Sequence, residues 1–260
     1  MKIYLMTDME GISGIHWIHQ VKKEYPQDYA YGQRCLIREI NFAVDALFSA
    51  GADEVVVCDG HTAGGNILMA DMDGRARYEP WYMPSLHSLD ASFDGVVLLG
   101  CHAKAGTLNG FLDHTMNSME WFRYTVHGKE IGEIGLLALR AGAHGVPVLT
   151  VTGDEKAAEE AKELLGAEHV TCASVKTGIG RNWAECLPIP QAQQQIRRAI
   201  EEGIALIGKV KPYQLPLPAP VELTFYRSDF ADRYNGKSDW DRKDARTVAK
   251  TISSFRERMW

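Results

Sequence analysis

The sequence has no long apolar run, no cluster of basic residues and no evident leader, and each absence narrows its function. No apolar stretch approaches the roughly 20 residues that a membrane-spanning helix needs, so no membrane partner is expected. Lysines and arginines are scattered over a chain of formal net charge −6, which disfavours a nucleic acid partner. The short apolar stretch at the N-terminus is interrupted at once by Asp8 and does not resemble a signal peptide.

The cysteine pattern is equally restrictive. The five cysteines are an odd number, and no two of them have the Cys-x-x-Cys spacing: Cys35, Cys58, Cys101, Cys172 and Cys186. A disulfide framework and a structural zinc knuckle are therefore not expected. Together with the missing leader, this pattern predicts a cytoplasmic protein.

What the chain does contain is the composition of a globular protein. Hydrophobic residues make up 45% and charged residues 24% of 260 residues, enough for one large α/β domain or two smaller ones. Short apolar segments alternate with amphipathic ones. We expect strands at 2–7, 54–58, 95–99, 121–127 and 146–152, and helices at 31–50, 131–143 and 155–165. This alternation predicts an α/β fold with a mostly parallel central sheet flanked by helices.

The last third of the chain has a different pattern. A long amphipathic segment at 191–207 predicts a helix, and a proline-rich connector follows at 211–220. A strand at 221–226 and a final helix at 243–259 are expected to close the chain. We therefore expect a metal-binding catalytic domain at 1–170 and a smaller C-terminal α+β lobe at 171–260, with one continuous domain as the alternative.

Metal-competent side chains follow three of the predicted strands. Asp8 and Glu10 come after the first strand, and on an extended chain both carboxylates point the same way. Two adjacent carboxylates repel unless a cation lies between them, although a solvated polar turn is an equally simple interpretation. His61 and His102 follow the second and third strands. A single His in such a place is usually a loop residue, but ligands of open α/β sheets bind at the carboxyl ends of strands.

Two further residues are candidates for the same site. Glu133 lies at the start of a predicted helix. An acidic residue in a first turn often interacts favourably with the helix dipole and has no further role. The neighbouring glycines, Gly132 and Gly135, favour a ligand role because they let the backbone approach a ligand closely. His114 lies in a polar loop of the same central region and follows Asp113.

These motifs together resemble a known family. The segment Asp8-Met9-Glu10-Gly11-Ile12-Ser13-Gly14 is similar to the N-terminal signature of the D-aminopeptidase (DppA-type) family of dinuclear zinc peptidases from bacteria and archaea. The similarity continues, in order, at residues 59–61, 100–105, 114–116 and 132–136, and it spans roughly residues 1 to 190. Asp113 departs from the family pattern, in which a small residue is expected before the histidine.

The resemblance implies an activity and a site. The implied metal ligands are Asp8, Glu10, His61, His102 and Glu133, and the implied catalytic residue is His114. They would hold two Zn²⁺ per chain, with Mn²⁺ or Co²⁺ as possible substitutes. A hydroxide shared by the two ions would then release N-terminal residues from short peptides, possibly D-amino-acid peptides. The family also implies a homo-oligomer, a ring-based decamer.

A division of the ligands between the two ions can be predicted. We expect Asp8 to bridge both ions, because each carboxylate oxygen can bind a different ion whereas a neutral imidazole has one lone pair. Glu10 and His61 would complete one site, and His102 and Glu133 the other.

Three other functions remain open at this point. The first is a dinuclear metallophosphoesterase or another metal-dependent amidohydrolase. The second is a cysteine hydrolase that uses Cys101 with His102, which is disfavoured because adjacent side chains on a strand point to opposite faces. The third is a binding subunit without turnover, which is disfavoured because none of the expected ligands is missing.

Overall fold

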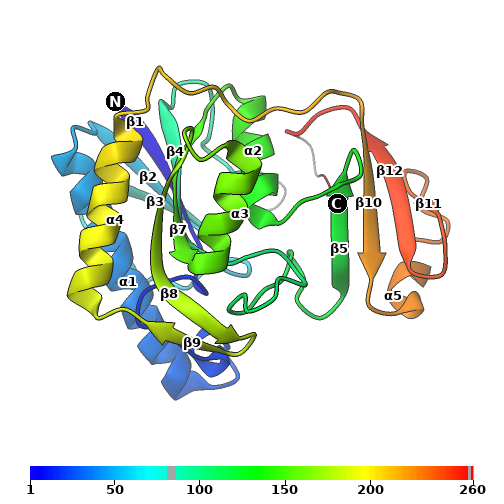
Figure 1. The fold of residues 1–260 in the computed structure, drawn as a ribbon, viewed down its shortest axis with the longest axis horizontal. Coiled ribbons are helices and arrows are strands. Elements are labelled where there is room, and N and C mark those ends of the chain that lie inside the picture. Colours follow the sequence, from blue (N-terminus) through cyan, green and yellow to red (C-terminus); the bar gives the residue numbers. More distant parts are fainter. Residues whose placement is uncertain (81–85, 257–258, 260) are drawn as a thin grey trace.

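Two β-sheets form the framework of the protein in a computed structural model that describes residues 1–80, 86–256 and 259 (Figure 1). The first sheet has seven strands, in the order β3 (Arg77–Pro80), β2 (Glu54–Asp59), β1 (Lys2–Thr7), β4 (Gly95–Cys101), β7 (Val148–Asp154), β8 (Thr171–Gly180) and β9 (Trp183–Cys186). The second has five, in the order β11 (Asp241–Arg242), β12 (Thr247–Ile252), β10 (Ala219–Phe225), β5 (Trp121–Val126) and β6 (Lys129–Glu130).

The seven-stranded sheet confirms the predicted fold class. Its strands run parallel from β3 to β8, and β9 is antiparallel to β8. Every residue of β4 and β7 is buried. Central parallel strands are covered on both faces, which explains why their sequences are continuous apolar runs rather than alternating patterns.

Helices cover both faces of this sheet. Ile3 and Leu5 of β1 belong to the apolar cluster that includes α1 (Pro26–Ser49) and α4 (Ile189–Ile204). Tyr4 and Met6 face the opposite way, into the cluster that includes α2 (Glu133–Ala143) and α3 (Glu155–Leu165). The alternation of side chains along β1 thus serves two cores. Short helices are η1 (Ile18–Val21), η2 (Met69–Asp71) and α5 (Ser228–Asp232).

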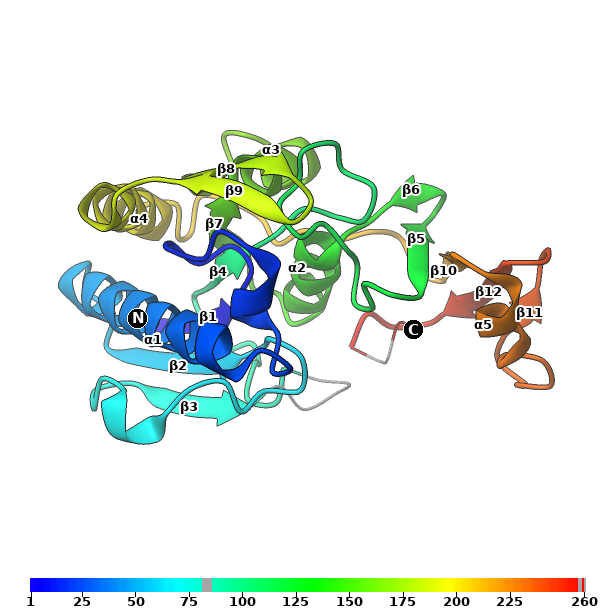
Figure 2. The ribbon, with the colours of Figure 1, turned by 90° about the horizontal axis from the view of Figure 1, so that it is seen from below.

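The five-stranded antiparallel sheet joins two distant parts of the chain. Strands β5 and β6 are inserted between β4 and β7 in the chain, and β5 pairs with β6 on one side and with β10, from the last third of the chain, on the other. This sheet lies to one side of the α/β layers in both views (Figures 1 and 2). The chain therefore does not pass from one sheet to the other at residue 170, because β8 and β9, which follow this residue, still belong to the seven-stranded sheet. The division into two domains stays a prediction.

The prediction of a final helix at 243–259 is wrong. Residues Thr247–Ile252 form β12, which pairs antiparallel with β10 on one side and β11 on the other. Four of its six residues are β-branched, which favours an extended chain, and the pairing covers an edge of β10 that would otherwise be open. Residues 257 and 258 of the expected helix lie outside the described part.

The other expected elements are present, β1 and α3 at their predicted bounds and the rest with shifted ends. Helix α1 begins earlier than expected, with Pro26 in its first turn, where proline is well tolerated. Helix α2 begins at Glu133, and the proline-rich connector is irregular up to the start of β10 at Ala219. Across the described residues, no helix has the length and apolarity to span a bilayer.

Candidate metal centre

The predicted ligands meet where the order of the parallel strands reverses. From β1, the strands β2 and β3 are added on one side of the sheet, whereas β4, β7 and β8 are added on the other. Ligands of such sheets bind at the carboxyl ends of the strands where this order reverses, here between β1 and β4. Asp8 follows β1, His102 follows β4, and His61 follows β2 on the other side of β1.

Asp8 and Glu10 lie on a turn and not on an extended chain, because β1 ends at Thr7. The turn is fixed to β4: the Asp8 amide donates to the Leu99 carbonyl at 2.8 Å, and the Gly11 amide donates to the Gly100 carbonyl at 2.7 Å. A Cβ on Gly11 would lie 2.1 Å from a carbonyl oxygen of β4, so this close approach requires glycine. The two carboxylates converge, but the turn and not strand alternation brings them together.

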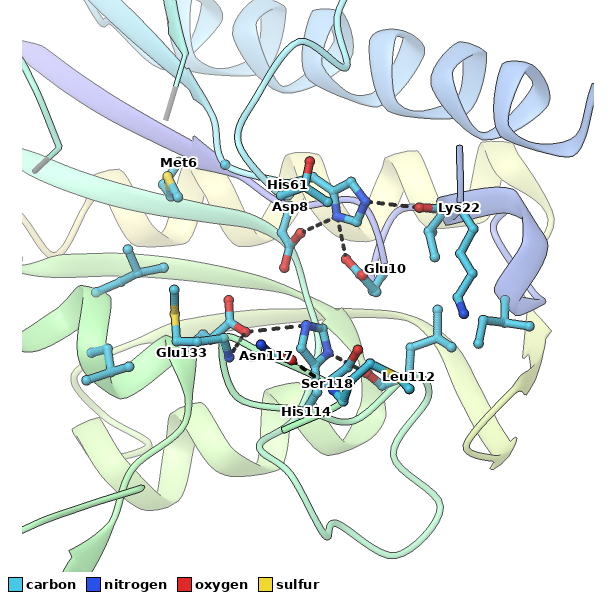
Figure 3. Close-up of a pocket in the computed structure, with 18 of the residues that line it drawn as sticks. Met6, Asp8, Glu10, Lys22, His61, Leu112, His114, Asn117, Ser118 and Glu133 are labelled. Atoms are coloured by element: carbon cyan, nitrogen blue, oxygen red, sulfur yellow. Dashed lines mark hydrogen bonds and ion pairs between the residues drawn. The ribbon is translucent and has the colours of Figure 1, made fainter. Parts of the chain in front are cut away.

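The first group of donor atoms surrounds one nitrogen of His61. Its Nδ1 lies 3.2 Å from Asp8 Oδ1 and 3.1 Å from Glu10 Oε2 (Figure 3). Its Nε2 lies 3.1 Å from the carbonyl oxygen of Val21, which can only accept a hydrogen bond. The proton of the neutral ring is therefore on Nε2, and the Nδ1 lone pair faces the two carboxylates. A backbone carbonyl commonly orients metal-binding histidines in this way.

The second group surrounds His102. Its Nδ1 donates to the Ala103 carbonyl at 3.0 Å, and its Nε2 lies 3.3 Å from Asp8 Oδ2 and 3.4 Å from Glu133 Oε1. This Nε2 is buried and has no hydrogen-bond partner among the described residues. A buried polar atom without a partner costs about 1–3 kcal/mol. A metal ion between His102, Asp8 and Glu133 would remove that cost, so the residues fit a bound ion.

His114 stacks on His102, with ring centroids 3.9 Å apart and an angle of 11° between the planes. Its Nδ1 donates to the Leu112 carbonyl at 2.8 Å, and its Nε2 lies 3.6 Å from Glu133 Oε1. Together with His102 and Glu133, it forms a second cluster close enough to hold an ion, separate from the cluster of Asp8, Glu10 and His61. Geometry alone thus permits His114 to be a ligand.

The electrostatics of the centre favour cations. Burial opposes ionisation of Asp8, yet the adjacent imidazoles of His102 and His61 hold the pKa of Asp8 well below its usual value. Burial also opposes ionisation of Glu133, but the charge of His102 lowers the pKa of Glu133. Burial opposes protonation of both ligand histidines, but Glu10 and Asp8 raise the pKa of His61, and Glu133 and Asp8 raise the pKa of His102, well above the usual value. Ionised carboxylates among imidazoles are a donor set that suits zinc.

A network that the sequence did not reveal holds the His61 loop. Asn66 is fully buried, and its side-chain amide donates to Asp59 Oδ1 at 2.8 Å and to the His61 carbonyl at 2.7 Å. Asp59 Oδ2 accepts the Asn66 amide at 2.7 Å, and the Tyr29 hydroxyl donates to Asn66 Oδ1 at 2.5 Å. Asp59 therefore anchors the loop and is not a ligand. The glycine-rich sequence around Asn66 was the available signal that this loop folds back tightly.

The centre opens into a cavity of about 680 Å³. Asp8, Glu10, His61, His114 and Glu133 line this cavity (Figure 3). His102 does not line it and instead borders a small void together with Asp8 and Glu133. The His102 side chain is 1% exposed and that of His114 is 16% exposed. The apolar walls are contributed by Ile18, Val21, Leu112, Met116, Leu136 and Leu137. The cavity has room for a short peptide beside the metal-competent groups.

Asp113, the departure from the expected pattern, has a structural role. Its Oδ2 accepts the Gly106 amide at 2.6 Å, and its Oδ1 lies 3.3 Å from Arg181 Nε. The side chain is largely buried and ties the loop before His114 to the turn between β8 and β9.

Comparison with known proteins identifies the family of the chain. The family model described as D-aminopeptidase matches residues 1–259. The chain belongs to this family. A D-aminopeptidase of Bacillus subtilis (strain 168) is 33% identical over 224 residues, which cover 83% of this chain and 78% of the relative. The predicted family resemblance is therefore confirmed.

A solved structure extends the likeness to the whole fold. It is the zinc-dependent D-aminopeptidase DppA from Bacillus subtilis, a self-compartmentalizing protease. The two structures superimpose with a TM-score of 0.93 at 30% sequence identity, covering 99% of this chain and 93% of that one. The similarity thus includes both sheets.

The alternative of a cysteine hydrolase has a direct test. Cys101 is buried, and burial together with the nearby charges of Asp8 and Glu133 raises the pKa of its thiol well above the usual value, which disfavours a nucleophilic thiolate. We expect a chelator to abolish hydrolysis and iodoacetamide to leave most of it intact. The measurement is peptide hydrolysis after each treatment, with zinc added back to the chelated sample as control. Loss of activity with iodoacetamide alone would favour Cys101.

Proposed function

We propose that this protein is a dinuclear zinc aminopeptidase that acts on short peptides. The observation that carries the proposal is the placement of the two Asp8 oxygens. Oδ1 lies 3.2 Å from His61 Nδ1, whereas Oδ2 lies 3.3 Å from His102 Nε2. One carboxylate thus faces two imidazole lone pairs in different directions. This arrangement suits a ligand shared by two ions.

The remaining ligands divide around Asp8. Glu10 and His61 complete one site, and His102 and Glu133 complete the other. Zinc, when bound in such a pair, provides a nucleophilic hydroxide at neutral pH and polarises the carbonyl of the substrate. The protein contributes the fixed geometry, because Val21 and Ala103 accept the remaining N–H of the two ligand histidines.

We assign proton transfer to His114. Its ring faces the cavity, and its Nδ1–H is held by the Leu112 carbonyl, so Nε2 is the atom available to a substrate. Glu133, 3.6 Å from that Nε2, stabilises the protonated ring. The protonated Nε2 can then donate to the leaving amine or to the developing oxyanion.

Aminopeptidase action is proposed from family membership, and it has a simple test. We expect dipeptides and tripeptides with a free N-terminus, D-alanyl peptides first and L-peptides second, to be cleaved. The same peptides with an acetylated N-terminus should not be cleaved. The measurement is product release by liquid chromatography. Equal cleavage of both forms would remove the aminopeptidase claim, and hydrolysis of phosphate monoesters in place of peptides would favour a metallophosphoesterase.

Self-association is part of the proposal. The DppA relative is a self-compartmentalizing protease, and we propose that this chain likewise forms a ring-based homodecamer that encloses its active sites. Light scattering of the purified protein should give about ten times the chain mass of 29.0 kDa. A particle of one chain mass at all concentrations would contradict this expectation.

A further inference from the structure

The loop that carries Glu10 is buried, although it is neither helix nor strand. Met9, Ile12 and Ile15 are 0% exposed, and Ser13 is 1% exposed. Loops usually run over the surface, because buried backbone amides and carbonyls must find hydrogen-bond partners. The groups that satisfy this backbone therefore decide where the Glu10 carboxylate lies.

Lys176 of β8 satisfies three carbonyls of this loop at once. Its Nζ donates to the carbonyl oxygens of Glu10 at 2.7 Å, Ile12 at 2.6 Å and Ile15 at 2.6 Å. An ammonium group has three N–H donors, so all of them are used within one loop. The ammonium also lies 4.9 Å from the centre of the Phe111 ring, a favourable cation–π contact.

A charged group in this place is unfavourable in itself. Lys176 is 2% exposed, and burial lowers the pKa of its ammonium group to about 8. Its three hydrogen bonds go to carbonyl oxygens and not to a carboxylate. A direct ion pair is therefore not the reason why a charged residue occupies this position. A methionine would fill the same space without the cost of desolvating an ammonium. What the methionine could not provide is the three hydrogen bonds to the loop.

We propose that Lys176 is a positioning residue for one half of the metal centre. By holding the Glu10 carbonyl, it fixes the Glu10 carboxylate beside His61 and Asp8. The other half does not depend on it, because His102 follows β4 and Glu133 begins α2, and both are held by other contacts. The inference rests on the proposed dinuclear site and adds a residue that controls one ion selectively.

The test compares Lys176→Met with a matched control, Thr150→Val. Thr150 is 0% exposed on the neighbouring strand β7, where its hydroxyl donates to the Ala199 carbonyl at 3.2 Å, far along the chain from the loop. Both changes remove a buried polar group from the same sheet. Zinc affinity and stoichiometry are measured by titration of the metal-free protein, and amide hydrogen exchange is measured for residues 9–16.

We expect Lys176→Met to lose one of two zinc ions, with the affinity of the weakened site reduced by roughly 10–100-fold, as is typical when a residue that orients a ligand is removed. Exchange of the loop amides should accelerate. Thr150→Val should keep both ions. At an equal folded fraction, its loop amides should exchange as slowly as those of the unaltered protein. Lys176→Gln, which retains two donors, should be intermediate and serves if the methionine variant does not fold.

The outcomes separate this inference from the proposed function. Unchanged affinity for both ions in Lys176→Met, or equal losses in Lys176→Met and Thr150→Val, would overturn the positioning role. If the unaltered protein bound no zinc, the proposed function would fail. Exchange of the loop amides would still show whether Lys176 holds the loop in place. Faster exchange of the loop amides in Lys176→Met than in Thr150→Val would support this role of Lys176, and equal exchange would refute it.

Discussion

Asp8→Ala is expected to lose both metal ions and nearly all peptidase activity. Both carboxylate oxygens are in use, one facing His61 and the other facing His102, so the substitution removes a ligand from each site at once. Loss of an outer partner of a metal ligand costs roughly 10–100-fold in affinity, and loss of a shared ligand should cost more at both sites. Zinc content and kcat/KM are measured on the same sample.

Graded substitutions make the Asp8 test specific. Asp8→Asn keeps one carbonyl oxygen and should retain about one ion, whereas His61→Ala and His102→Ala should each mainly weaken one site. Asp229→Asn is a useful control and should keep both ions, since Asp229 is an exposed carboxylate of α5 that pairs with Arg227. If Asp8→Ala kept one tightly bound ion, Asp8 would serve a single site and the bridging assignment would be wrong.

His114→Ala should differ in kind, with both ions kept and kcat reduced by roughly 10²–10⁴-fold, the range typical of a lost general acid. The reason is its position on the cavity side of the centre. His102, beneath it in the stack, is the buried histidine whose Nε2 lacks a hydrogen-bond partner among the described residues, and it therefore fits better as the ligand. Metal content and kcat are compared across pH.

His169→Ala, an exposed histidine at a remote turn, is the matched control and should leave both quantities unchanged. The competing outcome is clear, because His114 is close enough to His102 and Glu133 to share an ion with them. Zinc loss in proportion to activity in His114→Ala would make His114 a ligand and remove the general acid from this mechanism.

Local pattern predicted most of the α/β layers correctly. The buried strands β2, β4 and β7 were visible because a parallel strand covered on both faces is a continuous apolar run. The helix α3 was predicted at its observed bounds, because Asp154 caps it by accepting the Ala157 amide.

The last segment failed for a physical reason. Strand β12 lies at 247–252, where a helix was expected, because its conformation depends on pairing with β10 and β11. Such pairing partners are distant in sequence and leave little local trace, and β-propensity depends strongly on the neighbouring strands. For the same reason, the insertion of β5 and β6 into the second sheet could not be deduced from their own sequence.

The sequence by itself determined which residues could bind metal and that they would gather, since carboxylates and histidines after neighbouring parallel strands share one edge of a sheet. Only the tertiary structure decided how each donor atom is used. The opposite directions of the two Asp8 oxygens, the carbonyls that orient each histidine ring, and the placing of His114 toward the cavity depend on rotamers and turns set by packing. Lys176 shows the limit most clearly, because it lies more than 160 residues from the loop whose carbonyls it holds.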